Sequence, residues 1–284
     1  MEQYRNLPRL CFLLTAALSL LGVVLRSVCM LYCFDADIGY FADGILPTLS
    51  HILYFVAILA PIVCSIRTPK GQLSTEFRIA NRSILATVLG IFMAGFAVAL
   101  LVNILSEGLT VAEAGRFTPW LCLLGLAAST YYFSSARRDG RYPDWLSFLG
   151  YLPILWCVAA VADTYFDGFT AMNSPVKISI QLGILGFMLM VLAALRFRVG
   201  KPMPRYSVAF LSIGSFSCLV GSIPQLAAVC AGVITHIRHT LYAMVLLSAG
   251  VYGLYLLYRY TAAPASLSAD TPEPPSAEPH NTAE

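Results

Sequence analysis

Eight apolar stretches, each close to the length of a membrane-spanning helix, limit the folds open to this chain more than any other feature. A helix needs about 20 predominantly apolar residues to cross the hydrocarbon core of a bilayer. The stretches are Leu10–Cys33, Ile45–Ile66, Ser83–Leu105, Phe117–Ala136, Trp145–Ala162, Val176–Leu195, Ser207–Ile234 and Thr240–Tyr258. Composition agrees, because 58% of the residues are hydrophobic and 12% are charged, whereas soluble domains carry about 25% charged residues. We predict an all-α, polytopic membrane protein with eight transmembrane helices.

Two of the stretches differ from a simple span. The seventh is too long for a straight span, and a kink or a break is expected in it. The residues that favour this are Gly214, Gly221, Pro224 and Gly232. The first stretch follows Arg5 and Arg9, a flanking charge typical of cleavable signals, but its apolar run continues to Cys33. We therefore expect it to be retained as a span.

Positive and negative charges alternate in the loops, and this alternation predicts the orientation. Basic residues dominate the N-terminal flank and the second, fourth and sixth loops. They are Arg5, Arg9, Arg67, Lys70, Arg78, Arg82, Arg137, Arg138, Arg141, Arg196, Arg198, Lys201 and Arg205. Because cytoplasmic loops carry the excess of Lys and Arg, both termini are expected in the cytoplasm, which agrees with an even number of spans. The net charge of +3 leaves no basic stripe for nucleic acid.

Similar cues recur in the same order in the two halves of the chain, which suggests a duplication. A Tyr-Phe…Asp-Gly segment occurs at Tyr40–Gly44 and again at Tyr165–Gly168. Four spans per unit is an even number, so both units enter the membrane from the same side and the repeat is parallel. We expect a parallel 4+4 repeat of residues 1–138 and 139–261. A disordered cytoplasmic tail, 262–284, rich in Pro, Ala, Ser, Thr and Glu, follows it.

A parallel duplication implies two lobes, the first four spans against the last four, with a ligand site or pathway between them. A fused homodimer whose interface is its only product is an equally physical alternative. Small residues spaced by four also predict close helix packing in the third and seventh spans. These residues are Ala86, Gly90, Ala94, Gly95, Ala99, Ser217 and Gly221.

Arg26, in the outer half of the first span, is the most unusual ionisable residue. A charged side chain at the centre of a span costs about 3 kcal/mol on insertion scales. Arg26 could snorkel outward or pair with Asp35 or Asp37. Structural pairing and an outward-facing anion site are equally favoured by the sequence.

Other polar side chains gather near the outer ends of the spans. His51 and Lys177 hold similar places in the second and sixth spans, and an imidazole titrates near neutral pH. One extracytoplasmic vestibule is predicted from this concentration. Its candidate ligand-binding residues are Arg26, Asp37, His51, Asp163, Lys177, Gln181 and Gln225. Interhelical hydrogen bonds explain the glutamines without a ligand, and Asp-Gly turns account for Asp43 and Asp167.

The sequence carries no recognisable catalytic or cofactor-binding motif. Its eight cysteines form no CxxC pair, and buried apolar thiols are the better interpretation. His236 and His239, with an acid such as Asp163, are a weak candidate for a metal site, so none is predicted. An HExxH motif, a P-loop, a dinucleotide fingerprint and a nucleophile elbow are all missing from the sequence. We predict no cofactor, and an intramembrane enzyme is the least favoured class of function.

The segment Tyr151–Arg205, and above all Ala162–Gly168, resembles uncharacterised multi-pass membrane proteins of gut clostridia and related Firmicutes. The similarity extends across the spans and leaves out the tail. It implies a location in the cytoplasmic membrane of a bacterium. That group brings no assigned activity, so no residue role is carried over.

These observations favour binding or transport of a small solute through an outward-facing vestibule between two lobes. The alternative is a non-transporting membrane sensor or a partner-binding scaffold subunit. A carrier would continue its polar groups to the cytoplasmic side, whereas the inner halves of the spans are nearly free of ionisable residues. The expected surroundings are the lipid bilayer and a small-molecule ligand. A homo-oligomer and an unknown protein partner both stay open.

Overall fold

The computed structural model describes residues 7–35, 38–68, 83–108, 115–137, 147–168, 170–171, 173–199, 201 and 203–262. Several predictions fall outside these ranges. They concern Asp37, most of the basic residues of the second and fourth loops, and the tail beyond residue 262.

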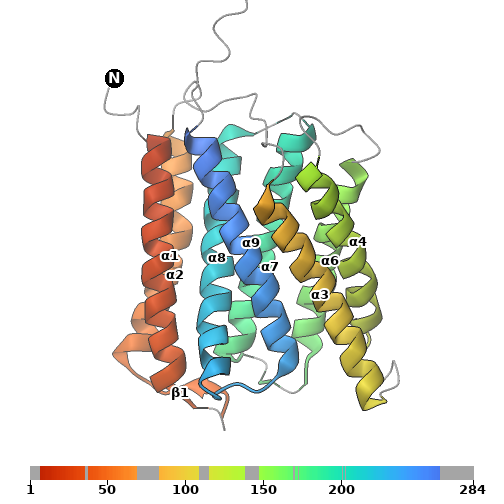
Figure 1. Ribbon diagram of the computed structural model, residues 1–284. Coiled ribbons are helices and arrows are strands. Elements are labelled where there is room, and N and C mark those ends of the chain that lie inside the picture. Colours follow the sequence, from red (N-terminus) through yellow and green to blue (C-terminus); the bar gives the residue numbers. More distant parts are fainter. Residues whose placement is uncertain are drawn as a thin grey trace, which may run out of the picture.

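The described residues form eight α-helices, and each coincides with one predicted span (Figure 1). Their bounds are α1 Leu7–Tyr32, α2 Ile45–Arg67, α3 Ile84–Glu107, α4 Thr118–Arg137, α6 Tyr151–Phe166, α7 Pro175–Val199, α8 Pro204–Cys230 and α9 Ile237–Ala262. A 3-10 turn, η3 (Phe148–Gly150), leads directly into α6. Between α1 and α2 lies a short antiparallel hairpin of β1 (Phe34–Asp35) and β2 (Tyr40–Phe41), in which Phe34 pairs with Phe41.

Seven of the eight helices in the described chain are long and apolar enough to cross a bilayer, which is compatible with an integral membrane protein. The exception is α4, which has 20 residues and a run of hydroxyl side chains. Ser129, Thr130 and Ser134 each donate a hydrogen bond to a carbonyl of their own helix, at 2.7 to 2.8 Å. These bonds satisfy the hydroxyls within the helix, whose composition is more polar than that of a typical span.

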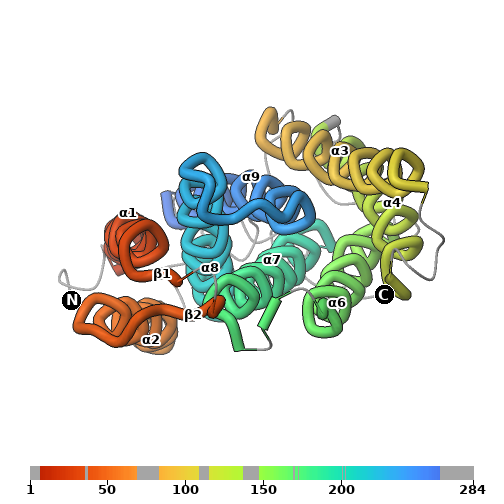
Figure 2. The backbone as a smooth tube through the Cα atoms, turned by 90° about the horizontal axis from the view of Figure 1, so that it is seen from below, coloured from red at the N-terminus to blue at the C-terminus, as the bar shows by residue number. Residues whose placement is uncertain are grey.

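Helix α8 is the centre of the bundle. It packs against α7, α9, α1 and α2, and 78% of its apolar window is buried, compared with 22% for α2. Figure 2 shows the α1–α2 pair on one side of α8, while α3, α4 and α6 lie beyond α7 and α9 on the other side. In the described chain, α1 and α2 therefore have no substantial contact with α3 and α4. The first four helices do not pack as one lobe, and the parallel repeat is not confirmed.

A break in the seventh span is contradicted, because α8 is one continuous helix with Pro224 inside it, and the alternative, a kink, stays a prediction. Its glycines permit close packing against α7. A Cβ atom added at Gly214 would lie 2.5 Å from the Gly186 carbonyl oxygen, and one added at Gly221 would lie 2.7 Å from the Ser179 oxygen. Ser217 is buried and packs on the same neighbour, against Gly186. Close packing was thus correctly predicted at Ser217 and Gly221, whereas an added Cβ at Gly95 meets nothing within 4 Å.

Aromatic side chains fill the core between α3, α6, α7 and α9. The Phe96 ring centroid lies 5.4 Å from that of Trp156 and 5.0 Å from that of Tyr242. Phe187 continues the cluster, with its ring centroid 6.3 Å from that of Trp156. All four rings are buried. Tilted and edge-on arrangements of this kind suit aromatic quadrupoles.

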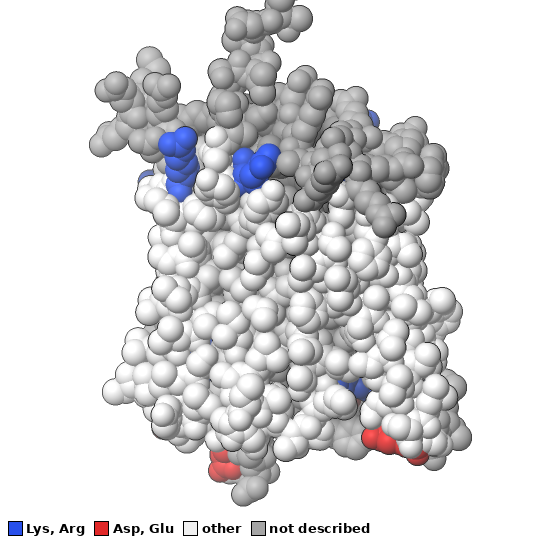
Figure 3. All heavy atoms as spheres, viewed as in Figure 1, with Lys and Arg blue, Asp and Glu red and all other residues white. Residues whose placement is uncertain are grey.

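The two ends of the bundle differ in charge (Figure 3). In the face shown, Lys and Arg atoms gather where α1 begins, Asp and Glu atoms lie near the opposite end, and the belt between them is almost uncharged. Two arginines at the end where α1 begins also form hydrogen bonds that join different parts of the chain. Arg198 is buried and donates to the Ser135 carbonyl at 3.0 Å and to its hydroxyl at 2.9 Å. Arg205 donates from Nε to the Thr68 carbonyl at 3.1 Å.

Candidate functional site

The predicted polar residues lie at the end of the bundle that carries the β1–β2 hairpin, which we call the hairpin end. They do not converge there on one vestibule. Arg26 and His51 line a cleft between α2 and α7. Asp163 and Lys177 belong to hydrogen-bonded groups around α6 and α9. Two separate sites therefore replace the single site predicted.

The Arg26 cleft is a cavity of about 510 Å³. It lies between α2 and the start of α7, with the end of α1 and β2 at its mouth. Its lining includes Arg26, Phe41, His51, Phe55, Ile178 and Ser179. A cavity of this volume is in the range of ordinary small-molecule sites, about 300 to 1,000 Å³.

Arg26 turns into the protein and makes its bonds to α7. It is 7% exposed, and its Nη2 atom donates to the Pro175 carbonyl at 3.0 Å and to the Ser179 hydroxyl at 2.8 Å. Its guanidinium carbon lies 4.6 Å from the centroid of the Phe41 ring, a cation–π contact. Within the described residues no carboxylate forms an ion pair with Arg26. Outward snorkelling and pairing with Asp35 are thus wrong, and Asp37 lies outside the described residues.

The mouth of the Arg26 cleft is formed by two helix N-termini. Helix α2 begins at Ile45, α7 begins at Pro175, and residues of both first turns line the cleft. The N-terminus of a helix carries roughly half a positive charge. Asp43 also lines the mouth and is exposed to solvent. Arg26 and the two helix N-termini place positive charge along the cleft, and Asp43 lies at its solvent-exposed mouth.

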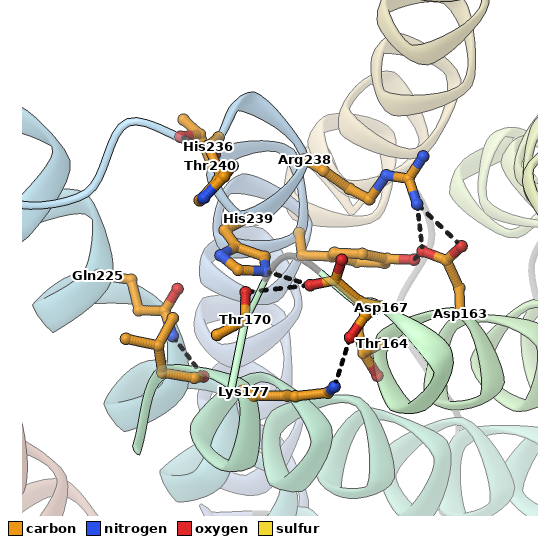
Figure 4. Close-up of polar contacts among 12 residues, drawn as sticks. Asp163, Thr164, Asp167, Thr170, Lys177, Gln225, His236, Arg238, His239 and Thr240 are labelled. Carbon is orange, nitrogen blue, oxygen red and sulfur yellow. Dashed lines mark hydrogen bonds and ion pairs between the residues drawn. The ribbon is translucent and has the colours of Figure 1, made fainter. Parts of the chain in front are cut away.

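Asp163 is the centre of the second group, which Figure 4 shows. It is 4% exposed, accepts from Arg238 Nη1 at 3.1 Å, and accepts from the Tyr242 hydroxyl at 2.8 Å. Arg238 Nη2 lies 3.4 Å from the Thr118 hydroxyl, to which it also donates. These contacts join α6, α9 and the first turn of α4. We call Asp163, Arg238, Tyr242 and Thr118 the Asp163 network.

Asp167 organises the connection from α6 to α7. His239 Nε2 lies 3.5 Å from its Oδ2 atom, and the Thr170 hydroxyl donates to the same oxygen at 3.0 Å. Lys177 is buried and donates from Nζ to the backbone oxygen of Asp167 at 2.8 Å (Figure 4). Lys177 therefore holds a loop in place, and it is not paired with His51 across a common cavity.

The two glutamines behave differently from each other. Gln225 is buried and donates from Nε2 to the Val176 carbonyl at 2.8 Å. Gln181 is half-buried on α7 and lies outside the lining of the Arg26 cleft. The bond of Gln225 joins α8 to α7, as expected of an interhelical hydrogen bond in a membrane.

A second cavity of about 410 Å³ lies beside Asp167, between the hairpin and the α6–α7 and α8–α9 connections. Ser174, His236 and His239 line it. The His236 and His239 ring centroids are 5.6 Å apart. Over the described ranges, no group of three or more His, Cys, Asp or Glu side chains is arranged to hold a metal ion.

Sequence reasoning missed several residues that the structure brings to these sites. Arg238 was not among the candidate residues, although it pairs with Asp163, an acid 75 residues earlier. Tyr242 and Ser179 carry no signal in the sequence, because a single hydroxyl on an apolar helix is common. Phe41 was interpreted as part of a turn, and its ring lies over Arg26.

No protein-family model matches the chain, and neither a curated protein nor a solved structure matches it. The site therefore has to be interpreted from its own geometry.

Proposed function

We propose that this chain is an integral membrane protein of a bacterial cytoplasmic membrane that binds a small anionic solute in the Arg26 cleft. One observation carries the proposal. Arg26 is a buried cation in a membrane-spanning helix, it lines a cavity, and no carboxylate among the described residues neutralises it. A bound anion would supply a countercharge that the described residues do not provide.

The donors of Arg26 that make no bond in the described chain leave room for a ligand. A charged side chain at the centre of a span costs about 3 kcal/mol on insertion scales, and Arg26 lies nearer the end of α1, so its own cost is smaller. Its two bonds go from one nitrogen, Nη2, to neutral oxygens of Pro175 and Ser179. Nε and Nη1 make no hydrogen bond to any described residue. Both forked edges of a guanidinium, Nε with Nη2 and Nη1 with Nη2, include Nη2, so Nε and Nη1 are left to donate separate hydrogen bonds to an anion.

Binding without passage is the form of this function that packing supports best. The seam next to the cleft is closed, because backbone atoms of α7 and α8 approach closely at Gly186–Gly214 and at Ser179–Gly221. The aromatic cluster around Trp156 fills the neighbouring interior. A solute could cross the membrane here only if α7 and α8 separated. We therefore favour a receptor or sensor over a carrier.

Orientation is part of the proposal. The positive-inside rule and the charge difference between the two ends (Figure 3) support cytoplasmic termini and an outward-facing Arg26 cleft. The division into units 1–138 and 139–261 and a homo-oligomeric or protein-bound state stay predictions.

Binding of anions to the purified full-length protein tests the proposal. The probes are inorganic phosphate, hexanoate and hexyl phosphate, with neutral hexanol as a reference. We expect saturable binding of at least one anion, and a loss of about tenfold or more in affinity in Arg26→Gln. Arg26→Lys keeps the charge without the planar fork and should be intermediate.

Arg9→Gln is the matched control, because Arg9 is an exposed arginine at the other end of the same helix. It should bind as the wild type does. Elution volume and circular dichroism identify variants that fail to fold. Equal affinity of the wild type and a folded Arg26→Gln variant, or no anion bound at all, overturns the proposal.

A further inference from the structure

We infer that the ligand of the Arg26 cleft is a single-chain amphiphile. Its anionic head, a carboxylate or a phosphate, would lie against Arg26, and its apolar tail would lie between α2 and α7. It would enter sideways from the lipid leaflet at the hairpin end. This inference rests on the proposed function and specifies the class of solute.

Polarity changes along the depth of the cleft in the way that such a ligand requires. On α2, His51 lies near the mouth, and Phe55 and Ile58 follow toward the middle of the helix. On α7, Ser179 and Ile178 are followed by Leu182. At 1.5 Å per residue, His51 and Ile58 differ in depth by about 10 Å. Most of the charged and hydrogen-bonding groups are therefore at one end of the cleft, and its deeper part is apolar except for Tyr54.

The spacing of these residues gives a continuous trough. His51, Phe55 and Ile58 are separated by four and three positions, so they lie on one face of α2. Ile178 and Leu182 are four positions apart and share a face of α7. Both faces line the same cavity. An extended alkyl chain can lie between two such stripes along its whole length.

The side of the cleft is open toward lipid. Helices α2 and α7 both pack on α8 but have no substantial contact with each other in the described chain. Phe55 is 64% exposed and Ile178 is 40% exposed, although both line the cleft. The floor is formed where Tyr54 packs edge-on against Phe216 of α8, with ring centroids 5.0 Å apart. A ligand can therefore reach Arg26 from the bilayer without crossing the closed seam between α7 and α8.

Chain length and charge are the two variables that test this inference. Alkyl carboxylates and alkyl phosphates of about four to about twelve carbons are titrated against the full-length protein in lipid nanodiscs. Empty nanodiscs give the correction for partitioning into lipid, and alcohols of equal length are the uncharged reference. We expect the corrected affinity to rise by roughly tenfold or more from the shortest to the longest anion, and Arg26→Gln to abolish the difference between anion and alcohol.

The Ile178→Trp variant gives a second measurement, because the larger side chain would fill the lipid-facing side of the Arg26 cleft. It should weaken binding of the longest anion by about tenfold and leave binding of the shortest anion and of phosphate unchanged. Val251→Trp on α9 is the matched control, because Val251 is also 40% exposed and lies outside the cleft.

The outcomes separate the inference from the function on which it rests. If short and long anions bind equally and both depend on Arg26, the tail is not recognised, and a free aqueous anion is the ligand. The inference then fails and the proposed function stands. If long anions and long alcohols bind equally in the wild type, Arg26 does not select the head and both proposals fail.

Discussion

Arg26 of α1 and Ser179 of α7 are 153 residues apart in the chain, and a hydrogen bond of 2.8 Å joins their side chains. The same Ser179 hydroxyl donates back to the Pro175 carbonyl at 2.7 Å. The guanidinium is therefore held by the first turn of α7, and its position depends on both helices. This arrangement fixes one side of the guanidinium and leaves the other side to the cleft.

Replacement of Asp163 by asparagine should destabilise the protein. The change removes the charge that neutralises Arg238 and weakens the acceptor for Tyr242. Because Arg238 is 28% exposed, solvent recovers part of the loss, and we expect a decrease of about 2 kcal/mol in the free energy of unfolding. Denaturation of the protein in detergent, followed by tryptophan fluorescence, measures it.

Glu107→Gln is the control for Asp163→Asn, because Glu107 is an exposed acid at the end of α3. Its stability should match that of the wild type. The double variant Asp163→Asn, Arg238→Gln should recover part of the loss, because it also removes the guanidinium whose carboxylate partner was replaced. An Asp163→Asn variant as stable as Glu107→Gln would show that the Asp163 network contributes nothing to folding.

Two glycine substitutions should have opposite effects on stability. Gly214→Ala places a methyl group 2.5 Å from the Gly186 carbonyl oxygen, and backbone cannot move aside cheaply, so a loss of about 2 kcal/mol is expected. Gly95→Ala meets nothing within 4 Å, and alanine favours a helix by up to about 1 kcal/mol over glycine. Thermal unfolding of the two variants side by side tests the α7–α8 seam. Equal melting temperatures of the two variants would contradict the close packing of α7 against α8 at Gly214.

Lys177→Met should leave anion binding in the Arg26 cleft unchanged. Lys177 makes its hydrogen bond to the Asp167 backbone oxygen and does not line the cleft. Its removal costs that bond but also relieves the burial of a charge, so stability should stay within about 1 kcal/mol of the wild type. The affinity for hexanoate or hexyl phosphate decides the point. A loss as large as that of Arg26→Gln would instead support the pseudo-symmetric pairing of His51 and Lys177.

Cys230 offers a test of orientation. It is the last residue of α8 and is exposed at the hairpin end. If that end faces outward, a membrane-impermeant maleimide should label the wild type in intact cells, and Cys230→Ala should lower the labelling to that of the half-buried Cys33 at the same end. In the Cys230→Ala background, Arg9→Cys should react only after the cells are permeabilised. Labelling of Arg9→Cys in intact cells, together with labelling of Cys230 only after permeabilisation, would contradict the proposed topology.

The sequence predicted the positions of the helices better than it predicted which helices pack against each other. Each apolar stretch became a helix, because span length and hydropathy are local properties. Which helices touch depends on the fit of side chains from distant segments, and the order of the spans contains no such information. Helix α8 lies at the centre of the bundle because glycines such as Gly214 allow α7 to approach it closely, and these glycines were interpreted as signs of a break. In a membrane, small residues more often allow two helices to approach.

Of the candidate residues predicted from the sequence, Arg26 and His51 line the cleft, whereas Lys177, Gln181 and Gln225 do not. Arg26 was identified from the sequence as a charge within a span, and Asp163 was one of several polar residues near the outer span ends. Their partners, Ser179 and Arg238, lie on helices that only the fold brings near. The sequence does not show whether an arginine at the end of a span contacts water, lipid headgroups or a carboxylate. Arg238 therefore could not be distinguished from an ordinary loop arginine.

The central place of α8 has a consequence for biosynthesis. The first two helices pack on α8 and not on α3 or α4, so ribosomes must synthesise about five further helices before α1 and α2 meet their main partner. Until then the pair lies in lipid by itself, and Arg26 lacks the α7 oxygens that later accept its hydrogen bonds. Capture of an early helix pair by a late helix is therefore a step in the maturation of this protein, and any factor that shelters Arg26 in the interval would act at that step.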